Sequence, residues 1–205
     1  NCMNLHAPKT VGQAKYLKAI HGQKPILVAT GPAGSGKTMF ACQYAAEKIK
    51  AREASKLILT RPLVGADENI GYLPGDSDTK MAPWTQPMID VFEEHLTRNQ
   101  LAGYVKIEPL GFMRGRTFNN SIIIADEMQN STQNQMKMLI TRIGENSKMI
   151  VMGDLNQTDL LDQKNGLIDL IERLGDDEYE YIDRVVLSDE DILRSPAVAE
   201  ILRIY

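Results

Sequence analysis

One short segment constrains the fold of this chain more than any other. Residues 31–38 read Gly-Pro-Ala-Gly-Ser-Gly-Lys-Thr, which matches the pattern G-x-x-x-x-G-K-[ST]. The apolar run Ile26–Ala29 comes directly before it, and a helical pattern from Lys37 to about Arg52 follows. A strand, a glycine-rich turn and a helix in this order can point backbone N–H groups at phosphate oxygens. The sequence therefore predicts a phosphate-binding loop that leaves a central, buried parallel strand.

Each residue type in this loop has a task in nucleotide binding. The glycines let the backbone curl, Lys37 supplies positive charge to the β and γ phosphates, and the Thr38 hydroxyl is a hard oxygen ligand for Mg²⁺. The predicted cofactors are therefore ATP and Mg²⁺. The residues expected to contact the nucleotide in this segment are Gly31, Pro32, Ala33, Gly34, Ser35, Gly36, Lys37, Thr38 and Met39.

Length and composition limit the class of protein. At 205 residues the chain is long enough for one α/β domain and short for two, so we expect a single domain over residues 1–205. The apolar runs are only strand-sized, so no membrane span is predicted. Cys2 and Cys42 are too few for a disulfide framework, which favours a reducing compartment, the cytoplasm. The net charge of -4 argues against a wholly basic surface but allows a local basic groove.

Short apolar runs alternate with helical patterns along the chain, which is typical of a mostly parallel sheet covered by helices on both faces. The further expected strands are 57–60, 104–109, 122–125, 149–152 and 181–187. The further expected helices are 11–20, 83–96, 132–143, 167–174 and 196–204, with Thr10 and Ser195 placed to cap the first and the last of them. Residues 61–82 show neither period and contain several prolines and glycines, so this stretch is either a functional loop or a tolerated surface insertion.

A pair of acidic residues follows the apolar run Ile122–Ala125. Asp126 and Glu127 in this position form a Walker B pattern. A buried strand would carry Asp126 to the sheet edge beside the phosphate loop, where its carboxylate can hold a magnesium-bound water. Glu127 would then be the catalytic base for the attacking water. Because a P-loop kinase passes phosphate to a bound acceptor and needs no such glutamate, hydrolysis is favoured over phosphotransfer.

The distance between these two motifs indicates the fold. Two strands, 57–60 and 104–109, fit between Lys37 and Asp126. One of them can separate the strand before the phosphate loop from the strand before Asp126, which is the RecA-like arrangement. We therefore expect a RecA-like, three-layer α/β/α fold.

A further apolar run, Lys148–Met152, ends in Gly153-Asp154-Leu155-Asn156-Gln157. A polar group at this strand end can touch the γ-phosphate, and Gln157 is the predicted catalytic residue of the segment. The spacing Gly-Asp-x-x-Gln resembles motif III of superfamily-one helicases, and Thr60-Arg61-Pro62 resembles their motif Ia. Gln13 is placed like the glutamine that reads adenine in those proteins.

Four further segments carry a resemblance to one family across nearly the whole chain. They are Leu73-Pro74-Gly75-Asp76, Met113-Arg114-Gly115-Arg116-Thr117, Asp126-Glu127-Met128-Gln129-Asn130 and Gln135-Met136-Lys137-Met138. Together with the motifs above, they closely resemble the PhoH-like ATPases, although Met128 stands where alanine is usual. The chain resembles neither the PIN nor the KH domain that some relatives add, and such a short form would suit a bacteriophage as well as a bacterium.

The resemblance implies a RecA-like domain that hydrolyses ATP, forms homo-oligomeric rings, with hexamers expected, and acts on or with RNA or single-stranded DNA. A single RecA-like domain normally takes its arginine finger from a neighbouring subunit. Arg142 lies at the end of the predicted helix 132–143, before the run Lys148–Met152, where ring-forming ATPases place that arginine, and Arg194 is the alternative. A surface salt bridge is the simpler role for either.

Several other side chains are candidates for nucleic-acid contacts. Arg61, Arg114 and Arg116 lie outside the predicted helices and can contact a polynucleotide backbone. Tyr72 and Trp84 can stack on bases, although such residues more often serve in packing. The run Met136, Met138, Leu139 and Ile143 has the spacing of a core-facing helix stripe.

Three functions remain open. The first is an oligomeric Mg²⁺-dependent ATPase of helicase-like descent. The second is a nucleotide-dependent switch that controls binding to a partner and has no motor activity. The third, a P-loop kinase, is disfavoured by Glu127 and by the segment that ends in Gln157.

Overall fold

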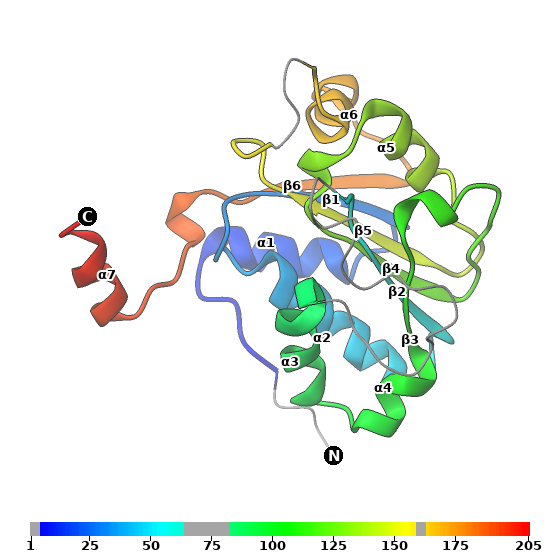
Figure 1. Ribbon diagram of the computed structural model, residues 1–205, viewed down its shortest axis with the longest axis horizontal. Coiled ribbons are helices and arrows are strands. Elements are labelled where there is room, and N and C mark those ends of the chain that lie inside the picture. The colour runs from blue at the N-terminus through cyan, green and yellow to red at the C-terminus, as the bar shows by residue number, and fades with distance from the viewer. Residues whose placement is uncertain (1–4, 64–82, 159–162) are drawn as a thin grey trace.

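The computed structural model describes residues 5–63, 83–158 and 163–205. At its centre is a six-stranded sheet in the order β3-β2-β4-β5-β1-β6, in which every pair of neighbours is parallel (Figure 1). The strands are β1 (Ile26–Thr30), β2 (Lys56–Thr60), β3 (Val105–Ile107), β4 (Ser121–Ala125), β5 (Lys148–Gly153) and β6 (Ile182–Val186).

Helices cover both faces of this sheet. They are α1 (Val11–Ile20), α2 (Lys37–Lys50), α3 (Gln86–Glu93), α4 (Arg98–Tyr104), α5 (Gln133–Ile140), α6 (Gly166–Leu174) and α7 (Pro196–Leu202). Short 3-10 turns lie at η2 (Pro83–Thr85), η3 (Leu110–Phe112), η4 (Met128–Asn130) and η5 (Asp189–Asp191). The helices α1 to α4 lie on one face, and α5 and α6 lie on the other (Figure 1). The chain thus has the predicted three-layer α/β/α architecture.

The central strands are apolar on both sides because both sides are covered. In β4, Ile122 and Ile124 pack under α1 to α4, while Ile123 and Ala125 face the layer of α5 and α6. All six residues of β5 are buried as well. This two-sided burial explains why these runs show no alternation of apolar and polar residues.

The position of the separating strand differs from the prediction. β5 lies between β4 and β1, whereas β2 and β3 lie beyond β4. The expectation that 57–60 or 104–109 would separate the two motif strands is therefore wrong, although one strand does separate them as in RecA-like proteins. Burial gives the reason: β5 is buried throughout, whereas the short β3 exposes Lys106 and lies at the edge.

Both predicted helix caps are confirmed. The Thr10 side chain accepts a hydrogen bond from the Gln13 N–H at the start of α1, and Ser195 accepts one from Val198 N–H at α7. Sequence reasoning missed α4, although Thr97 and Gln100 form a capping box there. The helix predicted over 83–96 is instead the 3-10 turn η2 followed by α3. The strand β3 is shorter than the predicted strand over 104–109.

Two parts of the chain lie apart from the packed layers or outside the described residues. α7 projects away from the sheet in Figure 1, and residues 193–205 are exposed. The predicted loop over 61–82 lies, from residue 64 onward, outside the described residues, and so do Tyr72 and the segment Leu73–Asp76. Across the described ranges, each helix is too short or too polar to cross a membrane.

Candidate active site

Three adjacent strands end at one edge of the sheet and bring the predicted motifs together. β1 leads into the phosphate loop, β4 into Asp126, and β5 into Asp154. The Gly31 N–H donates a hydrogen bond of 3.1 Å to the carbonyl of Gly153, which joins the first loop to the third. Open α/β sheets bind their ligands beside the carboxyl ends of the strands, so this edge is the candidate site.

The phosphate loop has a backbone that only small residues allow. Gly34 and Gly36 have φ angles of 81° and 95°, in the left-handed region that favours glycine. A Cβ atom on Gly31 would lie 2.7 Å from the Cβ of Leu187. The loop closes on itself through the Ser35 hydroxyl, which donates to the Pro32 carbonyl over 2.7 Å. The helix α2 then begins at Lys37, and within the described ranges no side chain caps its first turn, whose N–H groups point toward the loop's interior as in other helix starts.

Lys37 is folded into this loop and is only 8% exposed. Its ammonium group donates to the carbonyls of Gly31 and Pro32, the latter over 2.9 Å. Burial lowers the pKa of Lys37, while the negative charges of Asp126, Asp154 and Glu127 act in the opposite direction. Lys37 therefore lies within electrostatic reach of the acid pair, as the combined motifs predict.

Helix α1 supports the loop through two buried side chains. The Tyr16 hydroxyl donates to the Lys37 carbonyl over 2.7 Å, and its ring meets that of Phe40 edge to face. The Gln13 amide nitrogen donates to the carbonyls of Ser35 and Asp191, each over 3.2 Å. Gln13 thus lies against the loop and is 1% exposed. Its adenine-reading role stays a prediction, and sequence reasoning missed Tyr16.

Asp126 has the environment of a ligand for a cation. Its carboxylate accepts a hydrogen bond of 2.9 Å from the Glu127 N–H. Burial and the neighbouring charge of Glu127 raise the pKa of Asp126 to about 6, against the opposing charges of Lys37 and Arg61. The Asp126 carboxylate and the Thr38 hydroxyl are hard oxygen donors of the kind that Mg²⁺ prefers, so the residues fit the predicted ion.

Glu127 has an unusual backbone conformation. Its φ angle is 54°, in the left-handed region that costs a residue with a side chain on the order of 1–3 kcal/mol. Its carboxylate accepts a hydrogen bond of 2.6 Å from the side-chain amide of Gln129. Sequence reasoning gave Gln129 no role, and its only signal was its place in the segment 126–130 that resembles the PhoH-like ATPases.

The segment after β5 brings Asp154 close to the phosphate loop, although sequence reasoning gave this residue no role of its own. The charge of Asp154 acts on Lys37. The backbone N–H of Asp154 donates a hydrogen bond of 3.1 Å to the side-chain amide oxygen of Gln129. Gln157 lies at the same edge with an exposed side chain, and its N–H donates to the Asp154 carbonyl. Its contact with the γ-phosphate stays a prediction.

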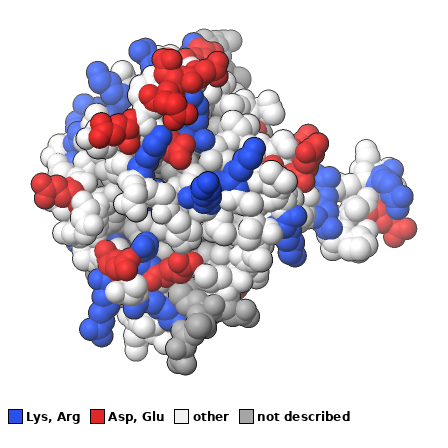
Figure 2. Space-filling view, turned by 180° about the vertical axis from the view of Figure 1, so that it is seen from behind, with Lys and Arg blue, Asp and Glu red and all other residues white. Residues whose placement is uncertain are grey.

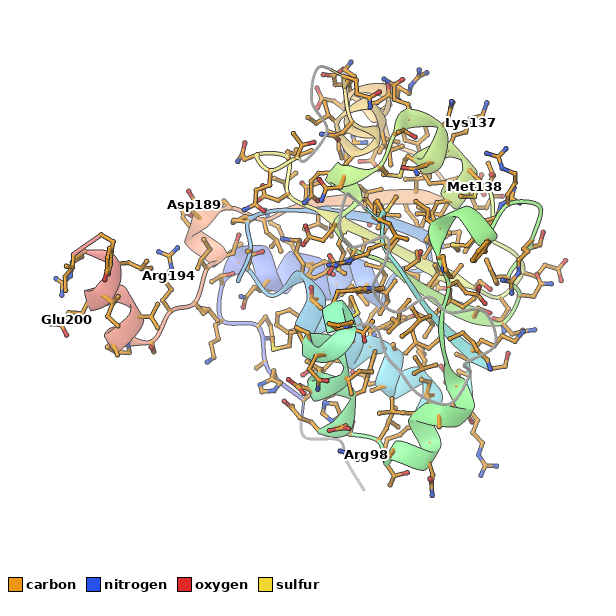
Figure 3. All side chains as sticks on the ribbon, in the orientation of Figure 1. Arg98, Lys137, Met138, Asp189, Arg194 and Glu200 are labelled. Atoms are coloured by element: carbon orange, nitrogen blue, oxygen red, sulfur yellow. The ribbon has the colours of Figure 1, made fainter. Side chains whose placement is uncertain are left out.

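The candidate finger Arg142 lies at the opposite edge of the sheet. Its carbonyl accepts a hydrogen bond from the N–H of Phe118, just before β4 begins. Its guanidinium donates to the carbonyl of Met138 and the hydroxyl of Thr141, each over 3.1 Å. Figure 3 shows the alternative, Arg194, on the exposed segment between η5 and α7. The trans role of either arginine stays a prediction.

The candidates for nucleic-acid contacts do not all lie near the site. Arg61 stacks on Trp84, 5.0 Å from the ring centre, and its charge lowers the pKa of Asp126, so this pair lies near the site. Arg116 instead forms an ion pair of 3.0 Å with Glu108, while Arg114 is exposed. The predicted stripe on α5 is confirmed as core, with buried residues at Met136 and Leu139 and partly buried ones at Met138 and Ile143.

Comparisons with known proteins identify the family of the chain. The profile of the family described as PhoH-like protein matches residues 6–205. Protein PhoH from Escherichia coli (strain K12) is 43% identical over 94% of the chain and 56% of its own length. The PhoH-like protein from Synechocystis sp. is 40% identical over 96% of the chain and 61% of its own length. The chain therefore spans little more than half of each relative.

Among solved structures, the Pif1 helicase from Candida albicans aligns with 97% of the chain and 43% of its own, at 14% identity and a TM-score of 0.48. The fold class follows from the strand order described above rather than from this likeness. The extent of the profile match and the level of identity to two relatives lead to one conclusion: the chain belongs to the PhoH-like family.

Proposed function

We propose that this chain binds ATP with Mg²⁺ and hydrolyses it. One observation carries the proposal: the phosphate loop and the acid pair leave the same sheet edge, on strands that only β5 separates. Lys37 and the first turn of α2 would hold the phosphates, and Thr38 with Asp126 would hold Mg²⁺. The ion, when bound, neutralises charge on the β and γ phosphates. Glu127 would take the proton of the attacking water.

We include in the proposal an action on or with RNA or single-stranded DNA. Its support is the likeness of several motifs to those of superfamily-one helicases and the stacked pair of Arg61 and Trp84 near Asp126. Arginine and aromatic side chains are the types that contact polynucleotide backbones and bases. On the face shown in Figure 2, basic and acidic side chains are interspersed, so a groove of limited extent is the form that we expect.

We also propose that the working unit is a ring of identical subunits, with six expected. Arg142 lies at the sheet edge opposite the phosphate loop of its own chain, so it would serve a neighbouring subunit. Arg194 is the alternative. Residues 1–205 would act as one ATPase domain in the cytoplasm, with 61–82 as a functional loop.

Steady-state ATP hydrolysis tests the proposal. The purified chain is assayed with Mg²⁺ or with EDTA, with and without single-stranded RNA or DNA, and its mass in solution is measured by light scattering. We expect Mg²⁺-dependent release of phosphate, faster with a polynucleotide, by an oligomer. Tight ATP binding without turnover would favour a nucleotide-dependent switch instead. Turnover that depends on a small phosphate acceptor would favour a kinase.

A further inference from the structure

We propose that Gln129 positions the carboxylate of Glu127 and ties it to the segment after β5, so that the base and this segment move together. The inference rests on the proposed ATPase function, because it concerns the residue that would act as the base. Three observations about Gln129 lead to it: the orientation of its amide, its confinement, and its attachment to two separate parts of the site.

The orientation of the Gln129 amide is fixed by its two partners. The backbone N–H of Asp154 can only donate, so it requires the amide oxygen, which it reaches over 3.1 Å. The amide nitrogen must then point the other way, where it donates to the Glu127 carboxylate over 2.6 Å. A hydrogen bond to a carboxylate is stronger than one between neutral groups. Gln129 therefore holds Glu127 with one end and the β5 segment with the other.

Gln129 has little room to adopt another position. Its side chain is buried, with 1% exposure. A Cβ atom on Gly153 would lie 2.6 Å from the Gln129 amide oxygen, so the end of β5 leaves only enough space for a glycine. The Thr158 hydroxyl donates to the Gln129 backbone carbonyl over 3.2 Å, which adds a second link to the same segment.

The confinement of Gln129 matters because the backbone conformation of Glu127 is not one that this residue type favours. Its left-handed conformation is unfavourable for a residue with a side chain, so surrounding contacts must maintain it. The segment that Gln129 joins to Glu127 also contains Asp154, whose charge acts on Lys37, and Gln157. A shift of this segment on nucleotide binding would thus be passed through one amide to the base.

Two variants separate the two ends of the amide. Gln129→Glu has almost the same shape and keeps an acceptor for the Asp154 N–H, but it loses the donor to Glu127. Gln129→Leu loses both contacts. Displacement of a reacting group by about 1 Å can cost on the order of 100-fold. We therefore expect kcat to fall about 10- to 100-fold in both variants, with the dissociation constant for Mg²⁺ and ATP within about twofold of wild type.

The deciding test is a double-mutant cycle in single-turnover hydrolysis, with Gln133→Leu as a matched control on the exposed first turn of α5. If Gln129 acts through Glu127, then Gln129→Glu slows the wild type but has no further effect on Glu127→Gln. Equal slowing in both backgrounds, or a loss of ATP affinity that matches the loss of rate, would overturn the inference and leave the ATPase proposal intact. A wild-type chain that hydrolyses no ATP would overturn both.

Discussion

The N–H of Gly31, the first residue after β1, donates a hydrogen bond of 3.1 Å to the carbonyl of Gly153, the last residue of β5. Through this bond the phosphate loop and the segment that carries Asp154 leave the sheet side by side. The acid pair at the end of β4 is then one strand away from the loop. The site is thus built from three loops whose relative positions are set by the order of their strands.

The support that α1 gives to the phosphate loop can be tested at Tyr16. The Tyr16→Phe variant removes the hydrogen bond from the Tyr16 hydroxyl to the Lys37 carbonyl, which keeps its helical partner within α2. A single hydrogen bond contributes about 0.5–1.5 kcal/mol, so we expect the free energy of unfolding in urea to fall by that amount. Tyr181→Phe is the control, since Tyr181 is 62% exposed. An equal effect in both variants would contradict this role of Tyr16.

The tight approach at Gly31 predicts a second effect on stability. In Gly31→Ala, the new Cβ atom would meet the Cβ of Leu187 at 2.7 Å, so the loop or β6 must shift. Overpacking of this kind costs about 1–3 kcal/mol, and we expect weaker binding of Mg²⁺ and ATP in equilibrium titrations as well. Gly111→Ala is the control, because a Cβ atom there has no neighbour within 4 Å among the described residues. Unchanged affinity in Gly31→Ala would refute the prediction.

The raised pKa of Asp126 predicts a dependence of stability on pH. The folded protein keeps this proton up to about pH 6, whereas the unfolded chain loses it near pH 3.8. The stability that the protonated form provides is therefore present below about pH 4 and is lost as the pH rises through 6. At pH 7 the Asp126→Asn variant should be more stable than wild type by up to about 3 kcal/mol.

Urea unfolding in EDTA without nucleotide measures this difference, because bound ligand would add its own stabilisation. The gain of Asp126→Asn over wild type should shrink as the pH falls from 7 to 4. Asp176→Asn, at an exposed position, should show no such trend. A gain that is constant over this range would mean that the charge of Asp126 is not its source.

The opposite-edge position of Arg142 predicts complementation between subunits. In Arg142→Ala, each site of a homo-oligomer would lack its finger, and the rate should fall by on the order of 1000-fold. Mixing Arg142→Ala with Lys37→Ala subunits should restore part of the activity, since some sites receive an intact loop and an intact arginine. Full activity of Arg142→Ala in the assembled ring would move the role to Arg194.

Local patterns in the sequence were enough to locate the elements that matter most. The phosphate loop requires certain residue types at fixed spacing, and two-sided burial makes β4 and β5 recognisable as apolar runs. The order of strands depends instead on contacts between distant segments. For this reason the placement of β5 between β4 and β1 was not foreseen, although the presence of a separating strand was.

The roles of single side chains could likewise be predicted where the partner is local in sequence, and not where it is distant. Thr10 was identified as a cap because its partner, the Gln13 N–H, is three residues away. Gln129 and Tyr16 were missed because each acts on a group that the fold brings from elsewhere. Tyr16 contacts the carbonyl of Lys37, and Gln129 contacts the N–H of Asp154. The sequence neighbours of Tyr16 and Gln129 do not name partners of this kind.

The most direct test of the account is single-turnover hydrolysis of Mg²⁺ and ATP by the Glu127→Gln variant. Glutamine keeps the size of the side chain and removes the base, so the rate should fall about 100- to 10,000-fold while the affinity for ATP stays within about twofold. Glu200→Gln, on the exposed α7 in Figure 3, is the matched control and should hydrolyse ATP at the wild-type rate. Undiminished hydrolysis by Glu127→Gln would contradict the assignment of Glu127 as the base.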